Sequence, residues 1–242
     1  MSVQNIFFLL FLSLLCSSCR KQVIQPPNSD LGYGYQPLTK GHYVIYDVDS
    51  VLYNDFTESI DTVSWQVKDE IGDSFVDDEG RTSNYVQRSQ RKRSSDPWQI
   101  DHVFYITKDN FKLEWKENNL RFIKMVFPVK INKKWQGNTY IPTRTNPELT
   151  WLDSWDYRYS DVVTSFNTGK KTYRKTHIVD QEDFLVGDLE PTTVFSARIY
   201  SREVWAENVG MVYREITNWE FQPSTSNFRK GFTVYFRARS NN

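Results

Sequence analysis

Cysteine is almost absent from this chain: of its 242 residues only Cys16 and Cys19 are cysteine, and both lie close to the amino terminus. No disulfide can therefore form within residues 20–242, even in an oxidising compartment where secreted domains often depend on them. An excess of either charge is also lacking, because 30 Lys and Arg balance 30 Asp and Glu. This neutrality argues against nucleic-acid binding, for which a strongly basic face is expected.

Long hydrophobic runs are lacking, apart from one between Ile6 and Leu15. As a helix this run rises about 15 Å, roughly half the hydrocarbon core of a bilayer, which is too short for a membrane span. It is apolar on every face and leads into a polar segment with Pro26 and Pro27, unlike a helix packed in a folded domain. The run is instead typical of the apolar region of a secretory signal.

Ser17, Ser18 and Cys19 follow this run directly. The start of the chain thereby resembles a bacterial lipoprotein precursor, in which small residues precede a cysteine that is lipidated and becomes the first residue of the mature protein. The resemblance implies that residues 1–18 are a signal peptide and that Cys19 carries the lipid. In that family an Asp after the cysteine favours the inner membrane. Arg20 stands here instead, which implies the outer membrane, and we expect a periplasm-facing lipoprotein because no acidic run follows.

Residues 19–37 are expected to form a flexible tether between the lipid and the domain, because they combine Pro, Gly and polar residues. Globular sequence begins near Leu38, and residues 38–242 fit a single β-rich domain. The sequence shows no helical periodicity longer than two turns. Aromatic residues make up 16% of the chain, and their enrichment favours strands over helices.

Several segments show strand patterns. The clearest is residues 61–71, where Val63, Trp65 and Val67 alternate with polar residues. Strands are also predicted within residues 42–54, 101–129, 192–223 and 231–239, whereas residues 144–163 are the least regular region. We therefore predict a mainly β fold with little helix: a single curled antiparallel sheet, or a partly open barrel or sandwich.

The predicted hairpin from Trp205 to Ile216 loosely resembles uncharacterised lipoproteins of Bacteroidetes-type bacteria, in which a Val-Gly-aliphatic-Val step follows a turn. In this resemblance Gly210 allows an unusual backbone angle or a bulge. The resemblance implies no activity.

Signatures of catalysis are lacking as well. The chain has no G-x-S-x-G elbow, no P-loop and no H-E-x-x-H motif. Its three histidines, His42, His102 and His177, lie far apart, and the spacing in residues 177–183 matches no strong zinc or calcium loop. We therefore expect no catalytic residue, metal or cofactor. A carboxylate pair of a hydrolase stays open, because the fold rather than sequence spacing brings such a pair together.

The segment from Thr150 to Asp161 is the main candidate for a ligand surface. It combines flat aromatic side chains with carboxylates, and the candidate residues are Trp151, Asp153, Trp155, Asp156 and Tyr157. Such a surface suits a sugar ring, which has an apolar face and a rim of hydroxyl donors. The alternative is that these aromatics form core, as large aromatics usually do.

A basic block within residues 87–95 is the second candidate. Its cations are Arg88, Arg91, Lys92 and Arg93. They form either a patch for anionic lipid headgroups or an acidic partner, or an exposed hairpin whose charges protect a strand edge from aggregation.

Together these patterns favour an outer-membrane lipoprotein with a non-catalytic binding or envelope-assembly role, whose partners are the membrane and an envelope protein or glycan. Two alternatives stay open. One is a carrier or sensor that holds a small apolar or glycan ligand inside the curled sheet. The other is a periplasmic hydrolase.

Overall fold

The computed structural model describes residues 31–224 and 227–242. The expected signal peptide, residues 1–18, and the expected lipidation site, Cys19, lie outside the described residues. Twelve strands and two short 3-10 helices make up the described elements. The strands are β1 (Tyr43–Asn54), β2 (Ser59–Val76), β3 (Thr82–Arg91), β4 (Gln99–Lys108), β5 (Lys112–Glu117), β6 (Leu120–Val126), β7 (Lys134–Gln136), β8 (Asp156–Asn167), β9 (Thr172–Val186), β10 (Ser196–Ala206), β11 (Gly210–Phe221) and β12 (Arg229–Asn241), and the helices are η2 (Tyr33–Tyr35) and η3 (Pro147–Leu152).

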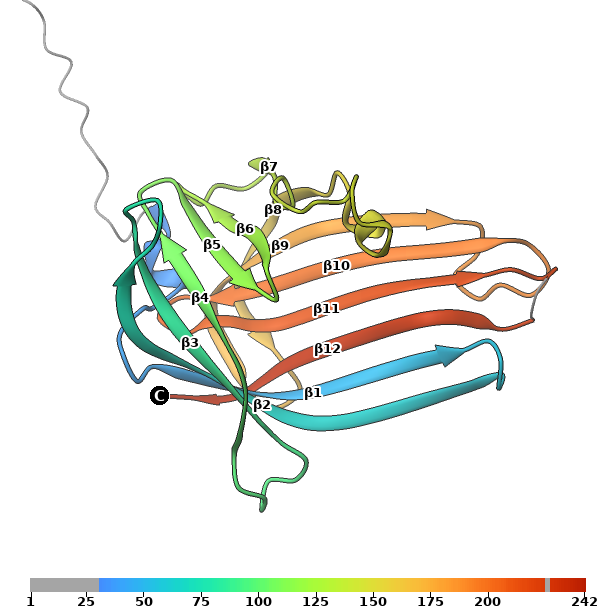
Figure 1. The fold of residues 1–242 in the computed structure, drawn as a ribbon, viewed down its shortest axis with the longest axis horizontal. Helices are drawn as coiled ribbons and strands as arrows, with labels where there is room; N and C mark the ends of the chain where they lie inside the picture. Colours follow the sequence, from blue (N-terminus) through green and yellow to red (C-terminus); the bar gives the residue numbers. More distant parts are fainter. Residues whose placement is uncertain (1–30, 225–226) are drawn as a thin grey trace, which may run out of the picture.

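All strands belong to one sheet in the order β6-β5-β4-β3-β2-β1-β12-β11-β10-β9-β8-β7, and every pairing is antiparallel. The sheet curls into a nearly closed barrel shape (Figure 1). The two edge strands approach each other, because the Ile123 backbone N–H donates to the Gly137 carbonyl at 2.8 Å. The Trp135 indole N–H donates back to the Ile123 carbonyl, also at 2.8 Å. The predicted curled antiparallel fold is therefore confirmed.

Alternation along each strand builds the core of the barrel. In β1, Val44, Tyr46 and Val48 are buried at every second position. Val204 and Trp205 on β10 are fully buried across the barrel, and the Trp205 ring meets the edge of another indole at 5.6 Å. Burial of this kind supplies most of the stabilising free energy of a sheet domain.

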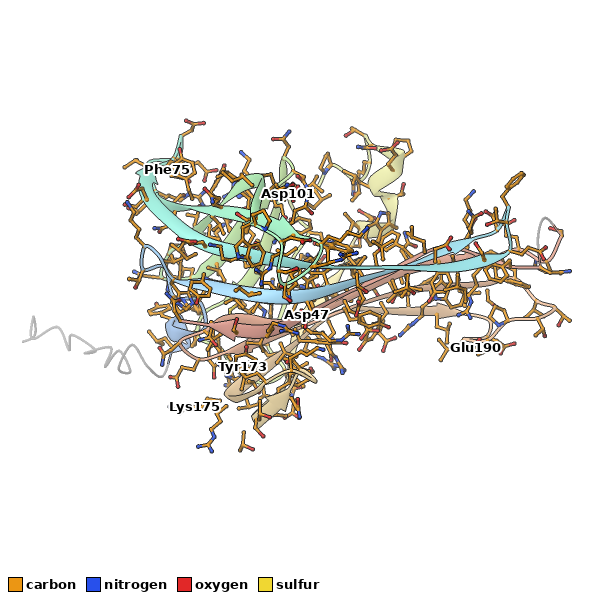
Figure 2. All side chains as sticks on the ribbon, turned by 90° about the horizontal axis from the view of Figure 1, so that it is seen from below. Asp47, Phe75, Asp101, Tyr173, Lys175 and Glu190 are labelled. Atoms are coloured by element: carbon orange, nitrogen blue, oxygen red, sulfur yellow. The ribbon has the colours of Figure 1, made fainter. Side chains whose placement is uncertain are left out.

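Six strands extend beyond the barrel as a flat tongue, which we define as residues 49–65, 181–201, 216–224 and 227–234 (Figure 1). The tongue arises because β3 pairs with β2 only as far as Gln66, and β8 pairs with β9 only as far as Asp180. Figure 2 shows the sheet from the side, with Phe75 at the barrel and Glu190 at the tongue. Val63, predicted on the buried face of its strand, is 52% exposed because it lies in the tongue.

The domain begins earlier than predicted, because residues 31–37 pack on the barrel. The carbonyl of Leu31 accepts a hydrogen bond from the Val129 backbone at 3.0 Å. Lys108 Nζ donates to the carbonyls of Tyr33 and Gln36 at 3.1 and 2.7 Å, and Gln36 is buried. The part of the expected tether that falls between residues 31 and 37 is therefore a docked segment, and the rest of it lies outside the described residues.

Candidate functional site

The aromatic residues of the predicted ligand surface lie in the core. Trp155 is 2% exposed and Tyr157 is 1% exposed. Trp155 donates its indole N–H to the Trp151 carbonyl at 2.8 Å, and the Tyr157 hydroxyl donates to Asn138 Oδ1 at 3.0 Å. Trp151 is half-buried and contacts Phe232 of the tongue, with ring centroids 5.9 Å apart. The Trp155 and Tyr157 rings therefore stabilise the fold and offer no open face to a sugar.

The two carboxylates of the same prediction point elsewhere. Asp153 accepts a hydrogen bond from the Thr143 hydroxyl at 2.5 Å, and this bond holds the pKa of Asp153 below its usual range. It borders a polar surface hollow of about 440 Å³ that has no aromatic wall. Asp156 accepts a hydrogen bond from the Gln136 amide on the outside of the sheet. The structure therefore separates the carboxylates from the aromatic faces with which they were grouped.

The predicted basic patch is also divided. Arg88 is 8% exposed and donates to both carboxylate oxygens of Asp69, at 2.7 and 2.8 Å. Arg91 lies over the Trp98 ring at 4.2 Å. Only Lys92 and Arg93 are exposed without an aromatic or buried partner of this kind. A buried guanidinium cannot meet lipid headgroups, so Arg88 does not belong to an anion-binding surface.

A cleft on the outer face of β2, β3, β4 and β5 combines the features that the sequence analysis sought. We call it the aromatic cleft, and it has a volume of about 420 Å³. Its lining residues include Phe75, Tyr85, Tyr105, Thr107, Glu114, Lys116 and Arg121. The Phe75 and Tyr85 rings stack at 4.2 Å, and the Tyr105 ring meets Phe75 edge-on at 5.4 Å. Tyr85 is 44% exposed even though Phe75 stacks on one face of its ring.

A buried carboxylate, Glu114, lies in the charged part of the aromatic cleft. Arg81, Arg121 and Lys112 all contact it, at 2.7, 2.8 and 2.6 Å. Burial alone would raise the pKa of Glu114, but the hydrogen bonds from these three cations outweigh it and hold the pKa below its usual range. Glu114 therefore stays ionised at neutral pH and organises the cations, a role that does not suit a general acid.

Sequence reasoning missed the aromatic cleft because its residues come from separate strands. Tyr85 and Tyr105 are 20 positions apart in the numbering yet directly opposite each other in the β3–β4 register. The alternation of side chains along a single strand would have shown only that Val86 and Tyr85 lie on opposite faces of the sheet. The register that joins the strands depends on the turns and the buried face, which single-strand patterns do not reveal.

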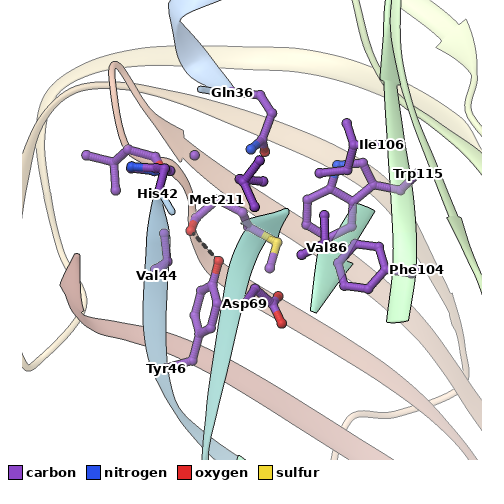
Figure 3. A pocket seen from close by; sticks show the side chains of 13 residues that line it. Gln36, His42, Val44, Tyr46, Asp69, Val86, Phe104, Ile106, Trp115 and Met211 are labelled. Carbon is purple, nitrogen blue, oxygen red and sulfur yellow. Dashed lines mark hydrogen bonds between the residues drawn. The ribbon is translucent and has the colours of Figure 1, made fainter. Parts of the chain in front are cut away.

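The interior of the barrel is filled. A cavity of about 20 Å³ lies between Tyr46, Asp69 and Trp115, and the Tyr46 hydroxyl donates to the Met211 carbonyl at 2.8 Å beside it (Figure 3). This volume is enough for about one water molecule. A glycan or lipid cannot occupy it, so this cavity does not support the interpretation of the chain as a carrier with an enclosed ligand.

A buried ion pair also fills the interior. Lys124 Nζ lies 2.5 Å from Glu203 Oε1, and the two side chains are 3% and 0% exposed. Burial lowers the pKa of Lys124, and the negative charge of Glu203 opposes that shift. Within residues 31–224 and 227–242 no group of three or more His, Cys, Asp or Glu side chains could hold a metal ion. No helix in these same ranges is both long and apolar enough to cross a bilayer.

Comparisons with known proteins give little further guidance. No family model matches the chain, and no curated protein matches it. Among solved structures it is similar to a presumed exported protein with a YmcC-like fold from Bacteroides fragilis, at 6% sequence identity and a TM-score of 0.41. The match covers 85% of this chain and 97% of that one. A score this low does not establish a shared fold, and no property of this chain rests on it.

Proposed function

We propose that this protein is an exported, lipid-anchored binding module of the cell envelope, without catalytic activity, that holds a carbohydrate in the aromatic cleft. The sequence pattern before Cys19 supports export and lipid anchoring, and Arg20 with no acidic run after it supports an outer-membrane site that faces the periplasm. The observation that carries the binding proposal is the exposed ring of Tyr85, set beside an ordered group of charges around Glu114.

The chemistry of a sugar ring matches this arrangement. Its apolar face stacks on an open aromatic ring, as Tyr85 offers, while its hydroxyl groups exchange hydrogen bonds with guanidinium and carboxylate groups at the rim. Lys116 borders the same cleft and is an available donor, whereas Arg121 already donates to Glu114 and Glu79. Because Glu114 is held ionised, it is not the protonated carboxyl that glycoside hydrolysis requires, which supports binding rather than cleavage.

The carbohydrate proposal is tested by screening the folded domain on an array of bacterial envelope polysaccharides, followed by calorimetric titration of the best glycan. We expect Tyr85→Ala to weaken binding at least tenfold, because it removes the open stacking face. Phe111→Ala is the matched control, since Phe111 is 74% exposed and does not line the cleft. Absence of any glycan binding by the folded wild type, or binding that Tyr85→Ala leaves unchanged, would contradict the proposal.

The remaining parts of the proposal have their own measurements. Release of shortened glycan products during the titration would show a hydrolase instead. For the anchor, the wild-type precursor and a Cys19→Ala variant are compared by membrane fractionation and by the mass of the amino-terminal peptide. We expect acyl mass at Cys19 and membrane association only in the wild type, because Cys19→Ala removes the thiol that carries the lipid. A wild-type protein without acyl mass would exclude lipid anchoring.

A further inference from the structure

One edge of the tongue is an unpaired strand. The pairing of β8 with β9 ends at Asp180, whereas β9 continues to Val186 and pairs with β10 there, with a register shift at Gln181. Within the part of the chain that the structure describes, the stretch from Gln181 to Val186 therefore has a strand on one side only. We call this stretch the β9 edge. Such an edge presents backbone N–H and C=O groups that can pair with another extended chain.

The second half of the β9 edge is apolar and open. Three successive residues, Phe184, Leu185 and Val186, are 45%, 42% and 41% exposed. Because side chains alternate along a strand, Leu185 faces the opposite side of the sheet from the other two. Natural proteins usually protect free edges with charged residues, Pro, bulges or covering loops. A register shift lies at Gln181, and Glu182 and Asp183 are charged, so only residues 184–186 lack such protection and indicate a surface used for association.

One backbone N–H of the β9 edge bonds to a nearby side chain instead of to a neighbouring strand. The N–H of Asp183 donates to the side chain of Glu182 at 2.9 Å. An incoming strand that accepts this N–H would free the Glu182 carboxylate. The displaced carboxylate would then be available to a cation on the incoming strand, so backbone pairing and charge pairing are coupled at this point.

Carboxylates gather where β8 leaves the β9 edge. A groove of about 240 Å³ is lined there by Asp156, Asp180, Glu182, Asp183, Lys134 and Arg158. Arg202 pairs with Asp180 at 2.8 Å, and Arg198 pairs with Asp183 at 2.5 Å. Glu182 and Asp156 instead use a backbone N–H and the Gln136 amide. Arg158 also lies 3.6 Å from Asp180. Among the residues that the structure describes, no ion pair includes Glu182 or Asp156, so these two carboxylates favour a cation from outside.

We propose that the β9 edge binds an extended segment of another protein, which adds to the sheet as a strand, places apolar side chains beside Phe184 and Leu185, and places a Lys or Arg near Glu182 and Asp156. Backbone hydrogen bonds supply affinity in this mode, and the side-chain positions supply specificity. The proposal is independent of the aromatic cleft, which lies on the barrel.

Charge also decides between a foreign segment and a second copy of this chain. Pairing of one β9 edge with another would bring two sets of Glu182 and Asp183 into one small area, where like charges repel. The other free edge of the tongue, in β2 between Ser59 and Ser64, carries Asp61 and is no better a partner for an acidic strand. A basic and apolar segment is therefore the occupant that fits.

The probe is a pair of synthetic peptides that alternate Val and Thr, one flanked by Lys and the other by Glu. Binding of each peptide to the protein is measured by fluorescence polarisation. We expect the Lys-flanked peptide to bind at least tenfold more tightly than the Glu-flanked one, with affinity that falls as salt rises. Glu182→Lys should abolish this preference. Thr62→Lys on the β2 edge is the matched control and should leave binding unchanged. Hydrogen exchange should show added protection of the Asp183 amide.

Leu185→Pro provides a second variant, because proline removes a backbone donor and blocks strand addition. It should eliminate binding of the Lys-flanked peptide. If this variant fails to fold, Glu182→Lys still decides. The proposal is overturned if neither peptide binds, if both bind equally, or if Glu182→Lys has no effect. It is also overturned if the wild type is a dimer by light scattering that Leu185→Pro converts to a monomer, since the second copy would then be the occupant.

Discussion

The ion pair between Lys124 and Glu203 allows the sharpest test of how the barrel interior is stabilised. Glu203→Gln removes the negative charge and leaves a buried ammonium group without its partner. Breaking a buried ion pair from one side costs about 3–5 kcal/mol, because the remaining charge is no longer compensated in a medium of low polarity. The lowered pKa of Lys124 limits the loss, since the amine can release its proton. We therefore expect a loss of about 3 kcal/mol in the free energy of unfolding.

Two comparisons isolate the effect of burial. The pair of Lys40 and Asp73 has nearly the same separation, 2.6 Å, but its side chains are 69% and 72% exposed. Asp73→Asn should therefore change stability by less than about 1 kcal/mol. The double variant Lys124→Met with Glu203→Leu removes both charges and should recover most of the loss, because apolar side chains of similar volume replace such pairs with little cost.

The assay is urea denaturation at pH 7, followed by tryptophan fluorescence and circular dichroism and extrapolated linearly to water. A loss below about 1 kcal/mol for Glu203→Gln would refute the reasoning, because the pair would then behave like an exposed one. The reasoning would also be refuted if the loss of stability in the double variant equalled the sum of the losses for Lys124→Met and Glu203→Leu measured singly, since the two charges would then show no coupling.

Three further outcomes follow from other parts of the structure. Burial lowers the pKa of His177, so the unfolded chain takes up a proton first as pH falls below about 6.5, and stability declines. His177→Gln should therefore reduce the fall in melting temperature between pH 7.5 and pH 5.5. An unchanged fall would contradict this reasoning. Gly231 has φ 141°, and a Cβ added to it would lie 2.1 Å from a backbone oxygen, so Gly231→Ala should lower the free energy of unfolding in urea by about 3 kcal/mol. Gly80 has φ 75° with open space around it, so Gly80→Ala should lower it by only about 1 kcal/mol. Equal losses would contradict the steric argument. A chain that starts at residue 38 should be about 2–4 kcal/mol less stable than one that starts at residue 31, because it lacks the docked aromatic segment; equal stability would restore the predicted boundary.

The elements of the fold that depend on local patterns were predictable. The alternation of Val44, Tyr46 and Val48 appears directly in the sequence and corresponds to buried positions of β1. The strands predicted within residues 101–129 are present, and the turn between β5 and β6 lies at Asn118 and Asn119, which both have positive φ, a conformation that asparagine tolerates better than most residues. Short-range chemistry determines these features, and the sequence displays it.

Features that depend on contacts between distant strands were not predictable. The alternation that places Val63 and Val67 on one face is correct, yet only Val67 is buried, because β3 covers one end of the strand and not the other. Trp155 and Tyr157 have the composition of a binding surface, but the curl of the sheet turns them inward. The residues of the aromatic cleft were missed for the same reason, since only strand register brings Tyr85 opposite its partner.

The docking of Leu31 has a consequence for how the molecule is oriented. The described chain starts at the barrel end, and the tongue extends from the opposite end (Figure 1). With Cys19 acylated as proposed, the eleven intervening residues 20–30 can span at most about 40 Å. The bilayer would then lie on the barrel side, and the β9 edge would point away from the membrane into the periplasm. Any segment captured there would come from a protein that approaches from beyond the membrane surface.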